Sequence, residues 1–324
     1  MMSLRRWAFL VALTLPLAVP ATASADIVLL VGQPYGRFGF FSPTGHAAVF
    51  LTRVCADGPL TVRMCSPGEP GAVISRYHRV AGRDWLVTPV IPYLYAVDNV
   101  SMVPREADRG AVLSLRDAYR RTHLSELIPD GPAGTPPKGD WVQTVGAAYD
   151  RVIVALGLPT TEREDRLLVD WLNARDNTAR FNLIVRNCAD FARDLFNVAY
   201  PGALKGRLVA DLGITTPKGL ARSLVARARE SDVPLVSFVV PQIPGSRRRS
   251  GRARGIIEGL VTTKKYAVPL LVLEPLVPAG LALGYLTTGR FDPVRHATGE
   301  VVSPAEVARI GEPGAGRDPV RRRD

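Results

Sequence analysis

Short apolar runs of strand length fill the first third of the chain. Residues 27–31, 46–54 and 72–80 are the clearest, and 84–90 is a fourth. β-branched and aromatic residues are frequent in these runs, and turn-forming residues separate them. This part of the chain is therefore predicted to form a sheet.

Helical spacing of apolar residues dominates after residue 110. Thr161 and Glu164 form a capping-box pattern at the start of one helix, and Pro201-Gly202 ends another. A short apolar run at 181–185 is interpreted as a strand-like segment leading into a helix. The predicted helices cover 112–128, 141–156, a segment after Thr161, 188–199 and 216–229.

The last part of the chain changes character after a strand-like run at 233–240. Residues 267–288 are almost wholly apolar and long enough to span a bilayer. Three prolines and Glu274 interrupt this segment, which favours a buried or surface-lying hairpin over a membrane span. Residues 297–324 are expected to be a weakly ordered tail.

The first 25 residues have the pattern of a secretory signal. A charged start at Arg5 and Arg6 precedes an apolar stretch, and the small residues at 23–25 suit a signal peptidase. Cleavage after Ala25 is favoured over an uncleaved anchor because the apolar stretch is short. We therefore expect an exported protein, periplasmic or extracellular, with two further parts at 26–201 and 202–296.

Composition allows an ordinary hydrophobic core, since 47% of the residues are hydrophobic. The formal charge is +11, and a basic run without aromatic residues lies at 247–254. In an exported protein such a run favours contact with anionic lipid or cell-wall polymer over nucleic acid, although a solvated basic loop has the same composition.

The chain has three cysteines, which an oxidising compartment divides into two kinds. Cys55 and Cys65 flank a turn and are expected to form a local disulfide. Cys188 has no partner left, so it is a reactive thiol, a buried inert thiol or an intermolecular one.

Cys188 opens a predicted helix, and His46 opens a predicted strand far upstream. A helix N-terminus stabilises a thiolate, and an imidazole accepts the thiol proton and returns it to a leaving group. This pair is the candidate catalytic site, and Asn187 is expected to cap the helix. The spacing of histidines and cysteines indicates no metal site, and no cofactor fingerprint is present.

The segments 45–51 and 187–192 resemble the circularly permuted branch of the NlpC/P60 papain-like superfamily, which includes the lecithin–retinol acyltransferase-like proteins. In that branch the histidine strand precedes the cysteine helix. The resemblance covers roughly residues 26–201. It implies an α+β fold with an antiparallel sheet packed on the cysteine helix, Cys188 as nucleophile and His46 as base.

The resemblance also implies hydrolysis or transfer at an amide, thioester or ester. The family usually has a third polar residue that orients the imidazole, and Ser75 and His78 are the two candidates here. Cell-wall peptide is the first substrate class that we expect, and a lipid acyl ester is the second. The rival hypothesis is a non-catalytic envelope protein of the same fold that binds cell-wall or membrane components.

Overall fold

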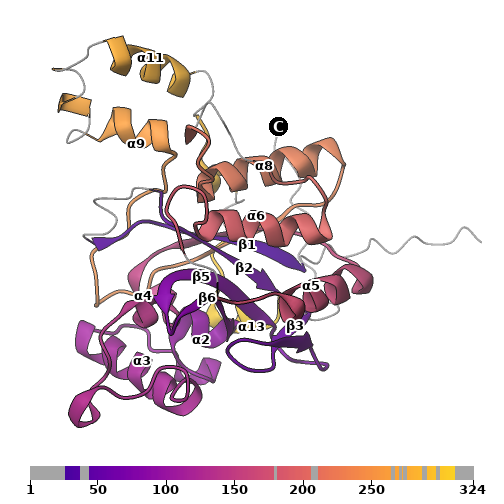
Figure 1. Ribbon diagram of the computed structural model, residues 1–324, viewed down its shortest axis with the longest axis vertical. Coiled ribbons are helices and arrows are strands. Elements are labelled where there is room, and N and C mark those ends of the chain that lie inside the picture. The colour runs from indigo at the N-terminus through magenta and orange to yellow at the C-terminus, as the bar shows by residue number, and fades with distance from the viewer. Residues whose placement is uncertain are drawn as a thin grey trace, which may run out of the picture.

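A six-stranded antiparallel sheet forms the centre of the computed structural model, with strand order β6-β5-β2-β1-β7-β8 (Figure 1). The structure describes residues 26–36, 44–178, 181–205, 211–263, 267–269, 272, 276–286, 290–296 and 300–310. The strands are β1 (Ile27–Gly32), β2 (His46–Leu51), β5 (Ala72–Val80), β6 (Arg83–Pro89), β7 (Ile153–Leu158) and β8 (Val236–Val240). This arrangement, with helices on both faces, confirms the predicted α+β class.

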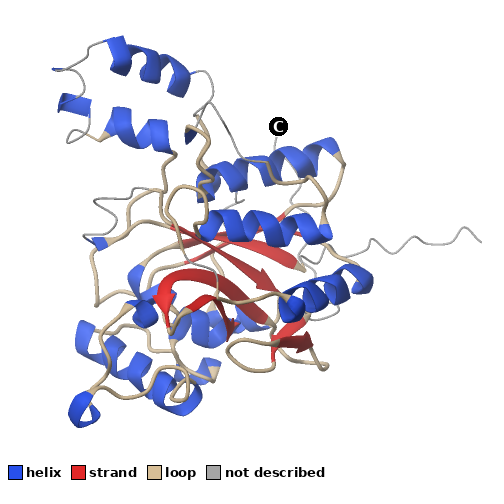
Figure 2. Ribbon diagram, viewed as in Figure 1, coloured by secondary structure: helices blue, strands red, loops and turns tan. Residues whose placement is uncertain are grey.

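Three amphipathic helices cover one face of the sheet (Figures 1 and 2). Their apolar sides pack on every second residue of the strands, including Leu29, Val49 and Ile74. The predicted capping box at Thr161 is present, and the predicted cysteine helix is confirmed with its bounds. These helices are α5 (Glu162–Ala174), α6 (Cys188–Ala199) and α8 (Pro217–Glu230).

Further helices and 3-10 turns cover the other face, to which Val28, Ala48, Phe50 and Val73 point. Buried aromatic residues from these elements complete the second core. The elements are α2 (Val90–Tyr95), η1 (Val100–Met102), α3 (Arg109–His123), η3 (Asp140–Gln143), α4 (Ala147–Asp150) and α13 (Pro304–Ala308). The 3-10 turn η2 (Pro132–Gly134), which follows α3, is exposed.

The helix predicted over 141–156 is wrong in its second half. A 3-10 turn and the short helix α4 occupy its start, and Ile153–Leu158 forms β7 between β1 and β8. This strand is buried on both faces, so its sequence is a continuous apolar run without alternation. Such a run fits a buried helix equally well, which explains the error.

The run at 181–185 is not a strand either. Asn182 and Arg186 close a turn through an antiparallel bridge, and the apolar side chains between them are exposed. This turn leads directly into α6.

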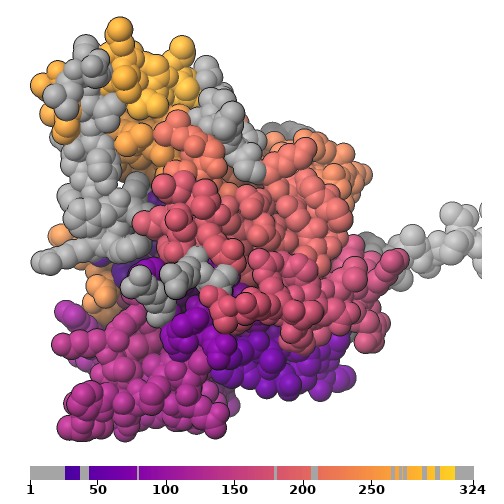
Figure 3. Space-filling view, in the orientation of Figure 1, coloured from indigo at the N-terminus to yellow at the C-terminus, as the bar shows by residue number. Residues whose placement is uncertain are grey.

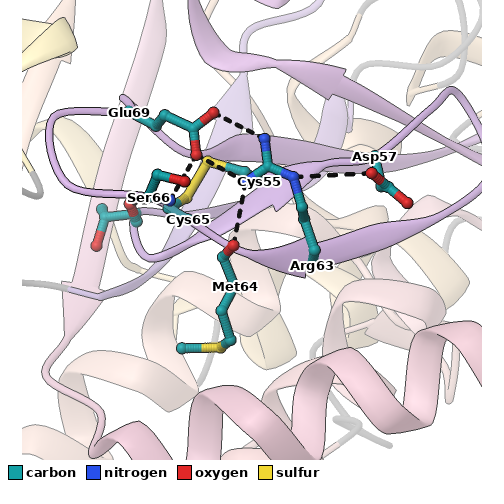
Figure 4. The surroundings of a disulfide bond; sticks show 8 residues. Cys55, Asp57, Arg63, Met64, Cys65, Ser66 and Glu69 are labelled. Atoms are coloured by element: carbon teal, nitrogen blue, oxygen red, sulfur yellow. Dashed lines mark hydrogen bonds and ion pairs between the residues drawn. A yellow bond between two sulfur atoms is a disulfide. The ribbon is translucent and has the colours of Figure 1, made fainter.

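The predicted disulfide between Cys55 and Cys65 is present, with an S–S distance of 2.04 Å. It joins the small hairpin of β3 (Val54–Ala56) and β4 (Val62–Met64) that follows β2 (Figure 4). Arg63 on this hairpin forms ion pairs with Glu69 and Asp57. The disulfide thus lies beyond the C-terminal end of β2, whereas His46 lies at its N-terminal end.

Beyond β8 the chain forms a lobe that stands out from the rest of the molecule (Figure 3). It contains α9 (Ile256–Thr262) and α11 (Leu276–Gly284), and α12 (Pro293–His296) follows it. A buried ion pair between Lys218 and Glu258, with N–O distance 2.5 Å, fixes α9 to α8. No helix among the described residues is long and apolar enough to cross a bilayer, and this includes the described part of the predicted apolar segment 267–288.

Part of the expected weakly ordered tail is held on the core. Val302 donates a backbone hydrogen bond to Val239 of β8, and the side chains of Val302 and Val307 are each 1% exposed. Residues 300–310 therefore belong to the folded body. The expected signal at 1–25, and residues 297–299 and 311–324 of the expected tail, lie outside the described residues.

Candidate active site

His46 is the first residue of β2 and is paired with a neighbouring strand on one side only. It pairs with Gly32 of β1, whereas the pairing of β2 with β5 covers only residues 49–51. Strand alternation puts His46 on the same face as Ala48 and Phe50, the face that α2 and α4 cover. The imidazole therefore points into the second core rather than toward the middle of α6.

Ser75 is the polar partner of this imidazole. The distance between His46 Nε2 and Ser75 Oγ is 2.7 Å, and Ser75 is 2% exposed. Tyr77, two residues further on the same face of β5, stacks on the imidazole with ring centroids 5.1 Å apart. A hydrogen bond and a stacked ring together fix the orientation of His46.

His78, the other candidate for this role, points the opposite way because side chains alternate along β5. It is exposed, with Nδ1 3.5 Å from a carboxylate oxygen of Asp140 and its ring edge on Phe181. The structure thus places Ser75, and not His78, at the imidazole.

Cys188 is the first residue of α6, and Asn187 caps this helix as the sequence predicts. The Asn187 side-chain oxygen accepts from the backbone N–H groups of Ala189 and Asp190. Its amide nitrogen donates to the carbonyl oxygens of Leu183 and Thr215. Because both ends of this carboxamide are used within the protein, Asn187 positions the helix start rather than a substrate.

A buried arginine of β5, Arg76, also holds the start of α6 in place. Arg76 Nη1 donates to the backbone oxygen of Asn187 at 3.2 Å, and Arg76 Nη2 pairs with Asp84 at 2.7 Å. Both side chains are almost fully buried, and the Arg76 guanidinium also lies 4.9 Å from the ring centre of Phe191. The backbone just before Cys188 is therefore held by a desolvated, charge-assisted contact.

The thiol of Cys188 lies beside the strand that carries His46. Burial raises the pKa of the Cys188 thiol, while the backbone N–H groups of Ala47, Ala189 and Cys188 itself act in the opposite direction. Ala47 immediately follows His46 in β2. The two motifs that the sequence singled out are thus brought to one place, the start of β2 and the start of α6.

His46 is uncharged at neutral pH. Burial, with a smaller contribution from the positive charge of Arg151, lowers the pKa of His46 to about 3. Cys188 keeps its proton at neutral pH because its pKa is raised. At neutral pH the resting site therefore contains an uncharged thiol and an uncharged imidazole.

Sequence reasoning missed three further side chains of this site, namely Tyr93, Arg151 and Tyr35. Tyr93 from α2 is close enough to interact electrostatically with Cys188, and burial raises its pKa to about 12. Arg151 lies between α4 and β7, with its guanidinium 4.3 Å from the ring centre of Tyr35. The sequence predicted a helix over 141–156, so Arg151 was expected in the middle of a helix. In the structure Arg151 lies between the end of α4 and the start of β7.

A comparison of the chain with family models, curated proteins and solved structures returns no significant match to any of them.

Proposed function

We propose that this protein is an exported cysteine hydrolase that cleaves an amide or an ester, with Cys188 as nucleophile and His46 as base. One observation carries the proposal: the thiol lies at the N–H of the residue after His46, while Ser75 holds the imidazole at 2.7 Å. A nucleophile, a base and a group that orients the base are the parts that thiol catalysis requires.

The neutral resting pair suggests how the reaction starts. As the sulfur attacks a carbonyl carbon, its proton passes to the imidazole of His46, which then gives it to the leaving nitrogen or oxygen. Backbone N–H groups at the start of α6 stabilise the oxyanion that forms. A water molecule, deprotonated by His46, then hydrolyses the thioester and releases Cys188.

The permuted papain-like assignment is part of this proposal. In its support, an antiparallel sheet packs on the cysteine helix, and the histidine strand comes first in the chain. Cell-wall peptide remains the first expected substrate class. The turn before Cys188 gives the second class, a lipid acyl ester, a specific argument, since Leu183, Ile184 and Val185 are 63%, 58% and 74% exposed.

Hydrolysis of cell-wall peptides and of short acyl esters by the wild type and two variants tests the proposal. Cys188→Ala should abolish turnover, and His46→Gln should lower it by about 100-fold or more. Asp170→Asn, on the outer side of α5, is the matched control and should leave turnover unchanged. Equal turnover in wild type and Cys188→Ala would refute the proposal.

The rival function is a non-catalytic envelope protein, and its support comes from the lobe beyond β8. Val272, Leu276 and Leu283 are 75%, 83% and 63% exposed, and Lys264, Lys265 and Arg290 flank them in the sequence. Exposed apolar residues near basic ones suit the surface of an anionic membrane. Under this hypothesis the protein binds such a surface equally well after Cys188→Ser.

Membrane-surface contact by this lobe is compatible with either function and has its own test. Leu276→Ser with Leu283→Ser should reduce sedimentation with vesicles of anionic phospholipid, while Leu113→Ser on the exposed side of α3 should not. Unchanged sedimentation of the double variant would exclude the lobe as the contact.

A further inference from the structure

Arg151 is a buried, positively charged residue at the candidate site, and the proposed catalytic mechanism gives it no role. The whole residue is 8% exposed, and its Nε is buried without a hydrogen-bond partner. Among the described residues, no carboxylate forms an ion pair with it. A desolvated charge without a counterion is costly, so proteins rarely keep one without a use.

The nearest acidic residue along the chain is already committed elsewhere. Asp150 pairs with Arg116 on one oxygen and with Arg247 on the other, each at 2.7 Å. The sequence of residues 37–43 contains no Asp or Glu. The titratable groups that interact electrostatically with Arg151 include His46, Tyr77, Tyr93 and Cys188. The two hydroxyls and the thiol keep their protons at pH 7, and burial keeps His46 uncharged by lowering its pKa to about 3. The surroundings of Arg151 therefore carry an excess of positive charge.

The backbone makes room for this guanidinium beside His46. A Cβ added to Gly32 would lie 2.7 Å from Arg151 Cδ and 3.2 Å from one of its terminal nitrogens. Gly32 is the residue of β1 that pairs with His46 of β2. The arginine thus occupies the place of a missing side chain next to the base, with the ring of Tyr35 against its guanidinium. A side chain cradled in this way is positioned before a ligand arrives.

We propose that Arg151 binds an anionic group of the substrate, a carboxylate or a phosphate, so that the enzyme selects acyl compounds with a negative charge near the scissile bond. A guanidinium offers paired N–H donors whose geometry matches both anions. That the anion belongs to a substrate rests on the proposed function. The anion site itself depends only on the buried guanidinium of Arg151 and the space that Gly32 leaves for it.

Binding to the inactive Cys188→Ala protein tests the anion site separately from catalysis. Isothermal titration would compare an N-acyl amino acid that has a free carboxylate with its neutral amide, and an acyl glycerol phosphate with the corresponding acylglycerol. The two pairs distinguish a peptide source of the anion from a lipid source. The charged member of one pair should bind about 10- to 100-fold more tightly than the neutral one.

Two variants made in this background should remove that preference by different routes. Arg151→Gln removes the charge, and Gly32→Ala keeps it but displaces the side chain from its cradle. Arg166→Gln, on an exposed turn of α5, removes an equal charge elsewhere and should change nothing. A charge preference that survives both Arg151→Gln and Gly32→Ala in folded protein, or no preference in the Cys188→Ala protein, would overturn the anion site.

The outcomes also separate this inference from the proposed function. Hydrolysis that depends on Cys188 but ignores substrate charge would refute the anion site and leave the hydrolase. Charge-dependent binding through Arg151 in a protein that hydrolyses neither ester nor peptide would support the anion site and refute the hydrolase.

Discussion

Two buried arginines, Arg76 of β5 and Arg151 just before β7, have opposite surroundings. Arg76, under the start of α6, is paired with Asp84 and with the backbone oxygen of Asn187. Arg151, over Gly32, has an aromatic ring and neutral groups around it but no described carboxylate in an ion pair. The first arginine completes the scaffold, whereas the second remains available to a ligand. Pairing, rather than burial alone, distinguishes a structural charge from a functional one.

The largest effect that this comparison predicts is on stability. Arg76→Met leaves the carboxylate of Asp84 buried without its main partner, so the free energy of unfolding should fall by about 3 to 5 kcal/mol. Arg151→Met removes an uncompensated charge and should leave stability within about 1 kcal/mol of the wild type, or raise it. Urea denaturation of both variants measures the difference, and equal losses would show that Arg151 is structural too.

Acid should lower the free energy of unfolding through His46, because its pKa is lower in the folded protein than in the unfolded chain. The unfolded chain binds a proton at His46 near pH 6.5, whereas the folded protein does so only near pH 3. The unfolded state therefore gains protons first as the pH falls, and His46 should contribute a loss of about 2 kcal/mol between pH 7 and pH 5. In His46→Gln this part of the loss should be absent. A wild type and variant with parallel pH profiles would contradict the shifted pKa.

The smallest effect is on the thiol itself. Arg151 lowers the pKa of Cys188, so Arg151→Gln should raise that pKa further and slow alkylation by iodoacetamide several-fold at neutral pH. Arg76→Lys keeps a positive charge beneath the α6 turn and is the control for changes in packing. An Arg151→Gln alkylation profile that overlies the wild-type one would place the guanidinium too far away to act on the sulfur.

The sequence predicted the parts of this site whose signals are local. Asn187 as a cap and Cys188 as the first residue of a helix follow from residue types over a few positions. The partner of His46 could be narrowed only to Ser75 or His78, because the bulge in β5 after Arg76 and the missing knowledge of which face is buried leave the register open. The role of Arg151 could not be predicted because the strand after it was taken for a helix. β7 is buried on both faces, so its sequence has no alternation of apolar and polar residues that would distinguish it from a buried helix.

Mass spectrometry after incubation with an activated acyl ester tests most directly whether Cys188 and His46 act as one unit. We expect an acyl adduct on the peptide that contains Cys188 in the wild type, much slower formation in His46→Gln, and none in Cys188→Ala. Adduct formation at the same rate in the wild type and His46→Gln, or on a residue other than Cys188, would contradict it.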